Sequence, residues 1–424
     1  MSDKLKNIAT LVVSVTVFYI VLETFVWRPQ LPQLPLTMHA SLGRLKPLAQ
    51  ISKDGLVPKD YVLIIGDSYA EGLGDWLMRE VGNGNPPHNA AHVLHDATGR
   101  DVMYFGKRGG YPAMTYTFST TSAYAGMQLY WGLGLEPPRD VVAYFFEGND
   151  INDTLASIKF YLGPDFDQSR KHDRAYVAAK LRATGADGRI RAQRRWHALR
   201  NAHLFDTSIK LVKLAGKNVS RGVGHMFDPT DPVYKAGAAY KENWSRYTDS
   251  PVRFAMDDGS ELPYPRDTVE PFAFHDDAAL DLGALWYGES LKYLRRLFPT
   301  SKIWAIYIPT PVMSYRLTVD AVTLSDRIRG ATSEKAGPPT KFTVGELFQR
   351  SNASCTRMFA AARDAGVEFI DARPAIRAAS GGVGHLHGPN DPGHFNKAGY
   401  TALAGVIEAG MKAPDTARGC AELQ

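Results

Sequence analysis

The sequence has few cysteines and lacks the glycine-rich loops that bind nucleotides. Its 424 residues include only two cysteines, too few for a disulfide scaffold and without the spacing of a metal site. Neither G-x-G-x-x-G nor a phosphate-binding loop occurs, so no nucleotide or other cofactor is indicated. The formal net charge of +5 is modest and does not indicate nucleic acid as a partner. A composition of 44% hydrophobic and 22% charged residues is typical of a folded globular protein.

The longest apolar run lies at the N-terminus. Residues 8–26 are almost wholly apolar, and about 19 residues at ~1.5 Å each span a bilayer core. Lys4 and Lys6 precede the run, which favours a cytoplasmic N-terminus. A cleaved signal peptide is the rival interpretation, but no clear small-x-small site follows. We therefore predict a cytoplasmic stub and transmembrane signal anchor over residues 1–28, then a Pro-rich extended spacer over 29–58.

The rest of the chain alternates between two hydrophobic patterns. Runs rich in Val, Ile and aromatic residues predict five strands, at 62–65, 102–105, 141–146, 303–308 and 367–370. Helical patterns lie between or after them, at 69–81, 86–98, 277–297, 344–365 and 396–411. Strands that alternate with helices predict an α/β fold with a parallel sheet covered on both faces.

A long insertion separates the third and fourth predicted strands. Residues 155–275 far exceed the length that a crossover needs. The stretch 156–221 holds fifteen Lys and Arg against five Asp and Glu. Five arginines surround Trp196, namely Arg189, Arg191, Arg194, Arg195 and Arg200. A solvated helical face and a surface for an anionic polymer or lipid head groups both remain open.

Three short blocks follow the first three predicted strands, at the end of the sheet where α/β proteins bind ligands. Block 66–72 reads Gly-Asp-Ser-Tyr-Ala-Glu-Gly and places Ser68 on a strand-to-helix turn. Block 106–110 is rich in glycine, which lets a backbone amide approach a substrate. Block 147–150 contains Asn149, whose side-chain NH₂ could stabilise an oxyanion. Each block alone is more typical of an ordinary turn.

A fourth block precedes the last predicted helix and supplies a base. It reads Asp391-Pro-Gly-His394-Phe-Asn. A serine hydroxyl becomes a good nucleophile only when a base accepts its proton. His394 could be that base, and Asp391 could fix its tautomer from the same turn.

Taken together and in this order, the four blocks resemble those of the SGNH/GDSL hydrolase superfamily. The resemblance implies that Ser68 is the nucleophile and that His394 and Asp391 are its base and orienting acid. It further implies an oxyanion hole formed by the amides of Ser68 and Gly109 and the side chain of Asn149. The implied fold is a flavodoxin-like three-layer sandwich with a five-stranded parallel sheet.

The resemblance covers roughly residues 60–150 and 300–412, and we expect one hydrolase domain over 59–412 followed by a C-terminal tail over 413–424. Two positions depart from the family pattern. Tyr69 replaces the leucine that gives the GDSL motif its name, and Glu147 precedes Gly-Asn-Asp.

The resemblance leaves three functions open. The expected one is an esterase that removes acyl groups, acetyl above all, from a carbohydrate or polysaccharide. The alternative is an acyltransferase, in which a sugar hydroxyl replaces water and a membrane acyl-transfer protein loads Ser68. A non-catalytic scaffold is the third. Similar anchored proteins belong to bacteria, so the expected location is the inner membrane with the catalytic domain in the periplasm or outside the cell.

Two further residue groups were weighed. Cys355 and Cys420 could pair in an oxidising compartment and staple the tail to the penultimate helix. His88, His92 and His95 share one helical face, but nearby ligands that would complete a metal site are missing. We therefore expect a disulfide and no metal centre.

Overall fold

The structure is a computed structural model. It describes residues 3–27, 52–54, 57–82, 90–106, 109–129, 135–160, 166–200, 240–266, 270–325, 339–412 and 419–423.

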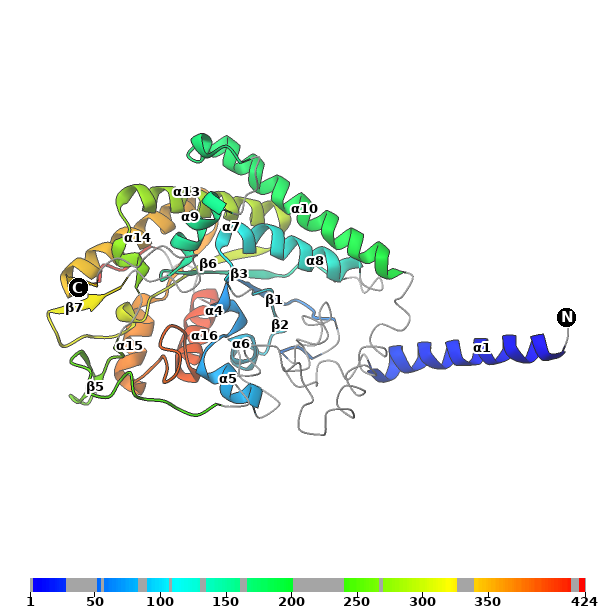
Figure 1. Ribbon diagram of the computed structural model, residues 1–424, viewed down its shortest axis with the longest axis horizontal. Helices are drawn as coiled ribbons and strands as arrows, with labels where there is room; N and C mark the ends of the chain where they lie inside the picture. Colours follow the sequence, from blue (N-terminus) through cyan, green and yellow to red (C-terminus); the bar gives the residue numbers. More distant parts are fainter. Residues whose placement is uncertain are drawn as a thin grey trace.

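The N-terminal segment is a helix that projects away from the other helices and strands (Figure 1). Helix α1 (Asp3–Val21) continues into the π-helical turn η1 (Leu22–Trp27). Its stretch Lys6–Val26 has a mean hydropathy of 2.1 and is 6% buried, so it is not a core helix of a soluble domain. The segment is long and apolar enough to cross a membrane, as the sequence predicted.

A five-stranded parallel sheet forms the centre of the remaining chain. Its strands are β1 (Val62–Ile65), β2 (Val102–Tyr104), β3 (Asp140–Phe146), β6 (Lys302–Ile308) and β9 (Glu368–Asp371), in the order β2-β1-β3-β6-β9. All four strand pairs are parallel. The predicted α/β class, the parallel sheet and the five strand positions are confirmed.

Helices cover both faces of the sheet (Figure 1). One face carries α4 (Ser68–Glu71), α5 (Asp75–Gly82), α6 (Ala90–Thr98), α15 (Arg373–Val383) and α16 (Lys397–Lys412). The other face carries η4 (Thr115–Ser119), α8 (Thr120–Leu129), α9 (Asp150–Phe160), α13 (Asp277–Leu297) and α14 (Val344–Asp364). The short helix α7 (Pro112–Met114) leads into η4.

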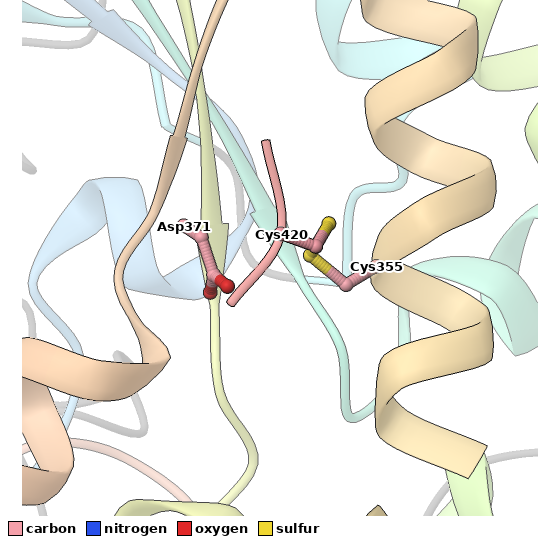
Figure 2. A group of neighbouring side chains, drawn as sticks. All are labelled: Cys355, Asp371 and Cys420. Atoms are coloured by element: carbon pink, nitrogen blue, oxygen red, sulfur yellow. A yellow bond between two sulfur atoms is a disulfide. The ribbon is translucent and has the colours of Figure 1, made fainter. Parts of the chain in front are cut away.

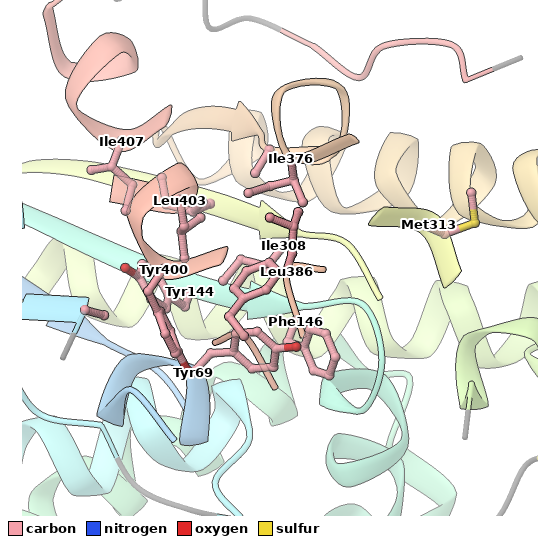
Figure 3. Packing of buried hydrophobic residues seen from close by; sticks show 14 of the residues in the cluster. Tyr69, Tyr144, Phe146, Ile308, Met313, Ile376, Leu386, Tyr400, Leu403 and Ile407 are labelled. Atoms are coloured by element: carbon pink, nitrogen blue, oxygen red, sulfur yellow. The ribbon is translucent and has the colours of Figure 1, made fainter. Parts of the chain in front are cut away.

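Strand β3 shows how the two cores divide. Val142, Tyr144 and Phe146 join the core on the α16 side, and the intervening residues join the core on the α13 side. Figure 3 shows Tyr144 and Phe146 among the α16 side chains and Tyr69. Because both faces are buried, the strand reads as a continuous apolar run with no polar alternation.

The predicted helix over 69–81 is wrong in one respect, since the structure divides it into α4 and α5. Helix α4 ends at Gly72, which adopts the left-handed conformation at φ 78°. A Cβ on Gly74 would lie 2.4 Å from the carbonyl oxygen of Phe395. The two glycines therefore break the helix where the chain must approach the loop that carries His394.

The segment between β3 and β6 is folded over much of its described length. After α9 come the turn η5 (Gln168–Arg170), the long helix α10 (Arg174–Arg200), the hairpin β4–β5 (Arg253–Ala255 and Glu261–Pro263) and η7 (Pro271–Phe274). A Cβ on Gly188 would lie 2.7 Å from the carbonyl oxygen of Phe118, so α10 approaches η4 closely. Arg182, Arg189 and Arg191 are exposed. The side chains of residues 194–200, around Trp196, and the rest of the basic stretch from 201 to 221 lie outside the described residues.

After β6, a second short hairpin leads into α14. The chain passes through the turn η8 (Val312–Ser314) and then forms β7 (Ala321–Leu324) and β8 (Thr340–Thr343), which pair antiparallel. Strand β8 runs directly into α14, where Thr343 caps the helix and forms a reciprocal pair of hydrogen bonds with Glu346.

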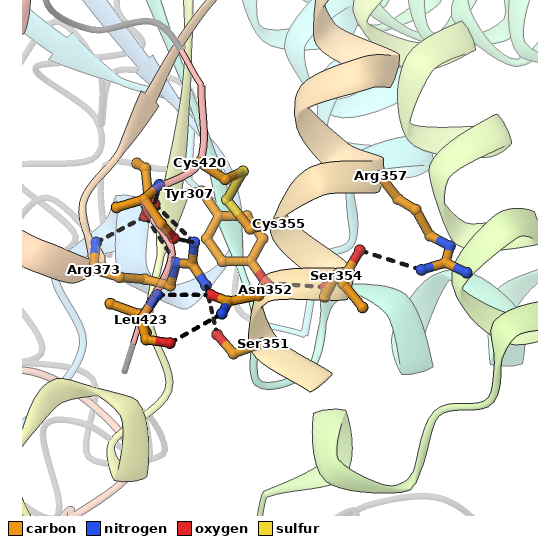
Figure 4. The surroundings of a disulfide bond; sticks show 12 residues. Tyr307, Ser351, Asn352, Ser354, Cys355, Arg357, Arg373, Cys420 and Leu423 are labelled. Carbon is orange, nitrogen blue, oxygen red and sulfur yellow. Dashed lines mark hydrogen bonds and ion pairs between the residues drawn. A yellow bond between two sulfur atoms is a disulfide. The ribbon is translucent and has the colours of Figure 1, made fainter. Parts of the chain in front are cut away.

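The C-terminal tail is tied to the sheet and to α14 (Figure 4). A disulfide joins Cys355 to Cys420. Arg373 is fully buried; it donates to the carbonyl of Ala421 at 3.0 Å and to the carboxylate of Asp371 at 2.8 Å. The tail is thus held beside β9 and α14 by one covalent bond and by hydrogen bonds.

Removing the disulfide should destabilise the domain. The bond closes a loop between residues 65 apart, so it restricts the unfolded chain considerably. We expect Cys355→Ser with Cys420→Ser to lower the free energy of unfolding by roughly 2–4 kcal/mol in urea titrations. Wild type unfolded in reductant should match the double variant. A double variant as stable as the oxidised protein would contradict the expectation.

Glu270 is a buried carboxyl group at the start of η7. Its Oε1 accepts from the Tyr264 hydroxyl at 3.1 Å and from the Val312 amide at 3.0 Å. Burial raises the pKa of Glu270 to about 8, well above its value in an unfolded chain. The folded state therefore holds this proton more tightly. The stabilising contribution is complete below about pH 4 and is lost as the pH rises towards 8.

Glu270→Gln should flatten this pH dependence. The Gln carbonyl can accept the same two hydrogen bonds and the side chain never ionises. Between pH 5 and 8, Glu270 should make the free energy of unfolding of the wild type fall by up to about 1.4 kcal/mol per pH unit, and Glu270→Gln should lack this decrease. Chemical unfolding at each pH measures both slopes. Glu261→Gln, at an exposed position on β5, is the control and should keep the wild-type slope. An unchanged slope in Glu270→Gln would show that Glu270 does not titrate in this range.

Candidate active site

Ser68 lies at the turn between β1 and α4. Asp67 caps the helix, with its carboxylate accepting from the Tyr69 amide at 2.9 Å. A Cβ on Gly66 would lie 2.9 Å from the Cβ of Tyr144, so the turn passes close to β3. Ser68 is 6% exposed, and its hydroxyl lies at the carboxyl end of the strands.

The structure brings His394 and Asp391 to this hydroxyl. Ser68 Oγ lies 2.8 Å from His394 Nε2, and His394 Nδ1 lies 2.8 Å from Asp391 Oδ2. The imidazole therefore bridges the hydroxyl and the carboxylate. With the proton on Nδ1 donated to Asp391, Nε2 is free to accept the proton of Ser68.

The turn that carries the pair is fixed on several sides. The Gly393 amide donates to Asp391 Oδ1 at 3.1 Å, and the Tyr69 hydroxyl donates to the Gly393 carbonyl at 2.8 Å. Burial by itself raises the pKa of Asp391, but the interactions with His394 and the Gly393 amide outweigh it and hold the pKa below its usual range. The carboxylate is therefore ionised at neutral pH and suited to orient the imidazole.

Asp75, which the sequence did not single out, holds the same loop from α5. Its Oδ2 accepts from the Asp391 amide at 2.7 Å and from the Asn390 amide at 3.0 Å. Its Oδ1 also accepts from the Asn390 amide at 3.0 Å and from the Tyr240 hydroxyl at 2.9 Å. Asp75 lies six residues after Gly66-Asp-Ser-Tyr69, and nothing in that motif points to this carboxylate.

Asn149 lies in the turn before α9 and contacts two acids. Its Nδ2 donates to Asp153 Oδ2 at 3.1 Å, while its buried Oδ1 has no hydrogen-bond partner. Burial raises the pKa of Asp67, whose side chain adjoins Ser68, and the interaction with Asn149 offsets part of that rise. The asparagine thus lies beside the nucleophile turn, with its amide group engaged by carboxylates in this structure.

These acids form a buried cluster behind Ser68, and sequence reasoning missed it. Burial raises the pKa of Asp67 and of Asp150, and it raises the pKa of Asp153 to about 7. Asp150 accepts from the Phe146 amide at 2.7 Å. The repeated acids of Asn149-Asp-Ile-Asn-Asp153 were the available signal. Carboxyl groups this close favour sharing protons over full ionisation.

Within the glycine block at 106–110, Gly106 lies beside the turn that carries Ser68. A Cβ on Gly106 would lie 2.5 Å from the Glu71 amide nitrogen, so this glycine contacts α4. Gly109 is exposed, has φ 61°, and would place a Cβ in open space. Residues 107 and 108 lie outside the described residues, and the oxyanion role of Gly109 stays a prediction.

His387 and His95 have hydrogen-bond partners other than Ser68, His394 and Asp391. His387 is fully buried and its ring lies 3.0 Å from the Tyr315 hydroxyl, while burial lowers its pKa to about 3. His95 Nδ1 contacts the Arg100 carbonyl at 2.6 Å, His92 is buried, and His88 lies outside the described residues.

One group of metal-ligand type occurs among the described residues. It comprises Cys355, Asp371 and Cys420 (Figure 2). The two sulfurs are bonded to each other and Asp371 pairs with Arg373, so these atoms are occupied by structural roles.

No protein-family model, curated protein or solved structure matches this chain. The functional argument therefore rests on the geometry around Ser68.

Replacing Asp75 tests whether this loop positions the base. In Asp75→Asn the new NH₂ group would face backbone N–H donors, so one anchor of the Asp391 loop is lost. We expect labelling of Ser68 by a fluorophosphonate probe to slow about 10- to 100-fold, typical of a lost orienting partner. Asp258→Asn, on the exposed hairpin turn, should label at the wild-type rate. A folded Asp75→Asn protein that labels as fast as wild type would refute the role.

Proposed function

We propose that this chain is a serine-dependent carboxyl-ester hydrolase of the SGNH/GDSL type that removes acyl groups from a carbohydrate. The observation that carries the proposal is the continuous contact from Ser68 through His394 to Asp391. Its two distances of 2.8 Å are those expected between a nucleophile, a general base and the acid that orients it.

The reaction would proceed through an acyl-enzyme. Ser68 Oγ attacks the ester carbonyl carbon while His394 Nε2 accepts the hydroxyl proton. The amides of Ser68 and Gly109 and the side chain of Asn149 would hold the oxyanion. Collapse expels the alcohol, which takes the proton from His394. Water, deprotonated by His394, then attacks the acyl group and releases the acid and the free serine.

The sheet order supports the finer fold assignment. In β2-β1-β3-β6-β9 the chain leaves β1 towards β2 and returns to place β3 on the other side. This reversal is that of a flavodoxin-like three-layer sandwich, in which ligands bind at the carboxyl ends beside the switch point. Residues 155–275 would be the insertion into that fold.

Two observations support a location outside the cytoplasm. The N-terminal stretch Lys6–Val26 could anchor the chain in a membrane. The Cys355–Cys420 disulfide is typical of an oxidising compartment such as the periplasm. We propose a single-pass protein of a bacterial inner membrane with its catalytic domain in the periplasm.

The first test uses residues 38–424 and follows two products. Wild type, Ser68→Ala and the exposed control Ser260→Ala receive 4-nitrophenyl acetate with and without a carbohydrate acceptor, and free acetate and acetylated sugar are measured separately. We expect acetate release in wild type and in the control and none above background in Ser68→Ala. Acetyl transfer to the sugar at the expense of acetate would establish the acyltransferase alternative. Equal turnover with and without Ser68 would refute both.

Asn149→Ala tests the oxyanion assignment. The variant should lower kcat about 10²- to 10³-fold with little change in KM, because the donor acts on the charge that develops in the transition state. Asn352→Ala, in the tail network, is a matched control that should alter stability and leave kcat unchanged. An unaltered kcat in a folded Asn149→Ala enzyme would remove Asn149 from the oxyanion hole.

A further inference from the structure

Trp244 is the one exposed tryptophan among those whose side chains the structure describes. Its side chain is 41% exposed, whereas the other tryptophans whose side chains are described, Trp76, Trp286 and Trp304, are at most 2% exposed. Exposing an indole to water has a free-energy cost that burial would remove. Because tryptophan is enriched at binding interfaces, this partly exposed ring is a candidate ligand contact.

The indole is held in place by its neighbours. Its ring packs edge-on against Tyr247 at 5.1 Å and against His385 at 5.2 Å, measured between ring centroids. The Trp244 carbonyl accepts from the amides of Tyr247 and Thr248 at 2.8 and 3.0 Å. Tyr247 is buried and donates to the His387 carbonyl at 3.2 Å. The exposed ring is thus preorganised and loses little conformational freedom on binding.

The segment that carries Trp244 is fastened to the catalytic loop. Asn390, adjacent to Asp391, accepts from the Asn243 amide at 2.7 Å and donates to the Lys241 carbonyl at 2.8 Å. Tyr240 reaches Asp75, which holds the same loop. Trp244 therefore lies on a segment that is hydrogen-bonded to the loop of Asp391 and His394, although Asn243 and Asn390 are 147 residues apart in the sequence.

A carboxylate is the charged group nearest the ring. Glu242 Oε2 lies 3.4 Å from the indole Nε1. Glu242 also forms an ion pair with Arg79 at 3.8 Å, with side chains 50% and 44% exposed. A fatty acyl chain has no polar groups to bond to this pair, and the Glu242 carboxylate beside the ring disfavours an anionic sugar.

We propose that Trp244, with Glu242 and Arg79, forms a subsite for a neutral sugar residue of the substrate. A pyranose has an apolar C–H face that packs on the electron-rich face of an aromatic ring, and hydroxyl groups at its edge that bond to a carboxylate and a guanidinium. The inference rests on the proposed function and deepens it. The subsite would bind the polymer beside the ester and present the acyl group to Ser68.

Binding to a catalytically dead protein separates this inference from the proposed reaction. The full chain carrying Ser68→Ala, in a sugar-free detergent, would be titrated with hexasaccharides of glucose, xylose, mannose and N-acetylglucosamine and with a hexasaccharide of galacturonic acid. Saturation-transfer NMR would report binding. We expect at least one neutral hexasaccharide to bind and Trp244→Ala to weaken its affinity at least tenfold. Trp244→Phe, which keeps an aromatic face, should retain much of the affinity.

Ile190→Ala, at an exposed apolar position on α10, is the control and should bind as well as the parent. The subsite is refuted if no neutral hexasaccharide binds, if only the galacturonate binds, or if Trp244→Ala binds unchanged. Loss of 4-nitrophenyl acetate turnover in Ser68→Ala, measured separately, reports the reaction alone.

Discussion

The parallel pairing of β1 with β3 is the constraint on which the site depends. Each strand is fully buried on both faces. A slip of one residue would move every side chain into the opposite core, where neither core would pack correctly. The register aligns Ile65 with Ala143. The turns that follow these strands, which carry Ser68 and Asn149, are consequently neighbours at one edge of the sheet. Ser68 and Asn149 thus share one rigid frame.

Polar contacts between loops bring His394 and Asp391 to the end of the sheet where Ser68 lies. Ser68 and His394 are 326 residues apart in sequence, and their contact requires α16 and its preceding loop to return to β1. Gly74 allows the close backbone approach, and Asp75 satisfies the amides of the returning loop. The acids around the site divide by environment. Asp391 has a lowered pKa beside His394, whereas burial raises the pKa of Asp67 behind Ser68, so Asp391 keeps its negative charge to lower pH than Asp67 does.

Much of the fold could be predicted because the central strands are long apolar runs and the main helices have regular periodicity. The errors arose where tertiary contacts override local pattern. The break between α4 and α5 follows from the approach of Gly74 to Phe395, which no local spacing reveals. Helix α10 was not predicted as one element of 27 residues because its weak apolar pattern is interrupted by glycines that contact η4 and α13. Contacts with η4 and α13 stabilise α10 more than its intrinsic helix propensity does.

The sequence by itself determined the element types, the strand positions and the chemical identity of the residues beside each strand end, because hydrophobic periodicity and short motifs are local properties. Only the tertiary structure decided which of these residues meet. It placed His394 at Ser68, bonded Asp75 to the Asp391 loop, gathered three carboxyl groups around Asn149 and left Trp244 partly in water. These outcomes depend on contacts between segments up to 326 residues apart, and no single stretch of sequence encodes such contacts.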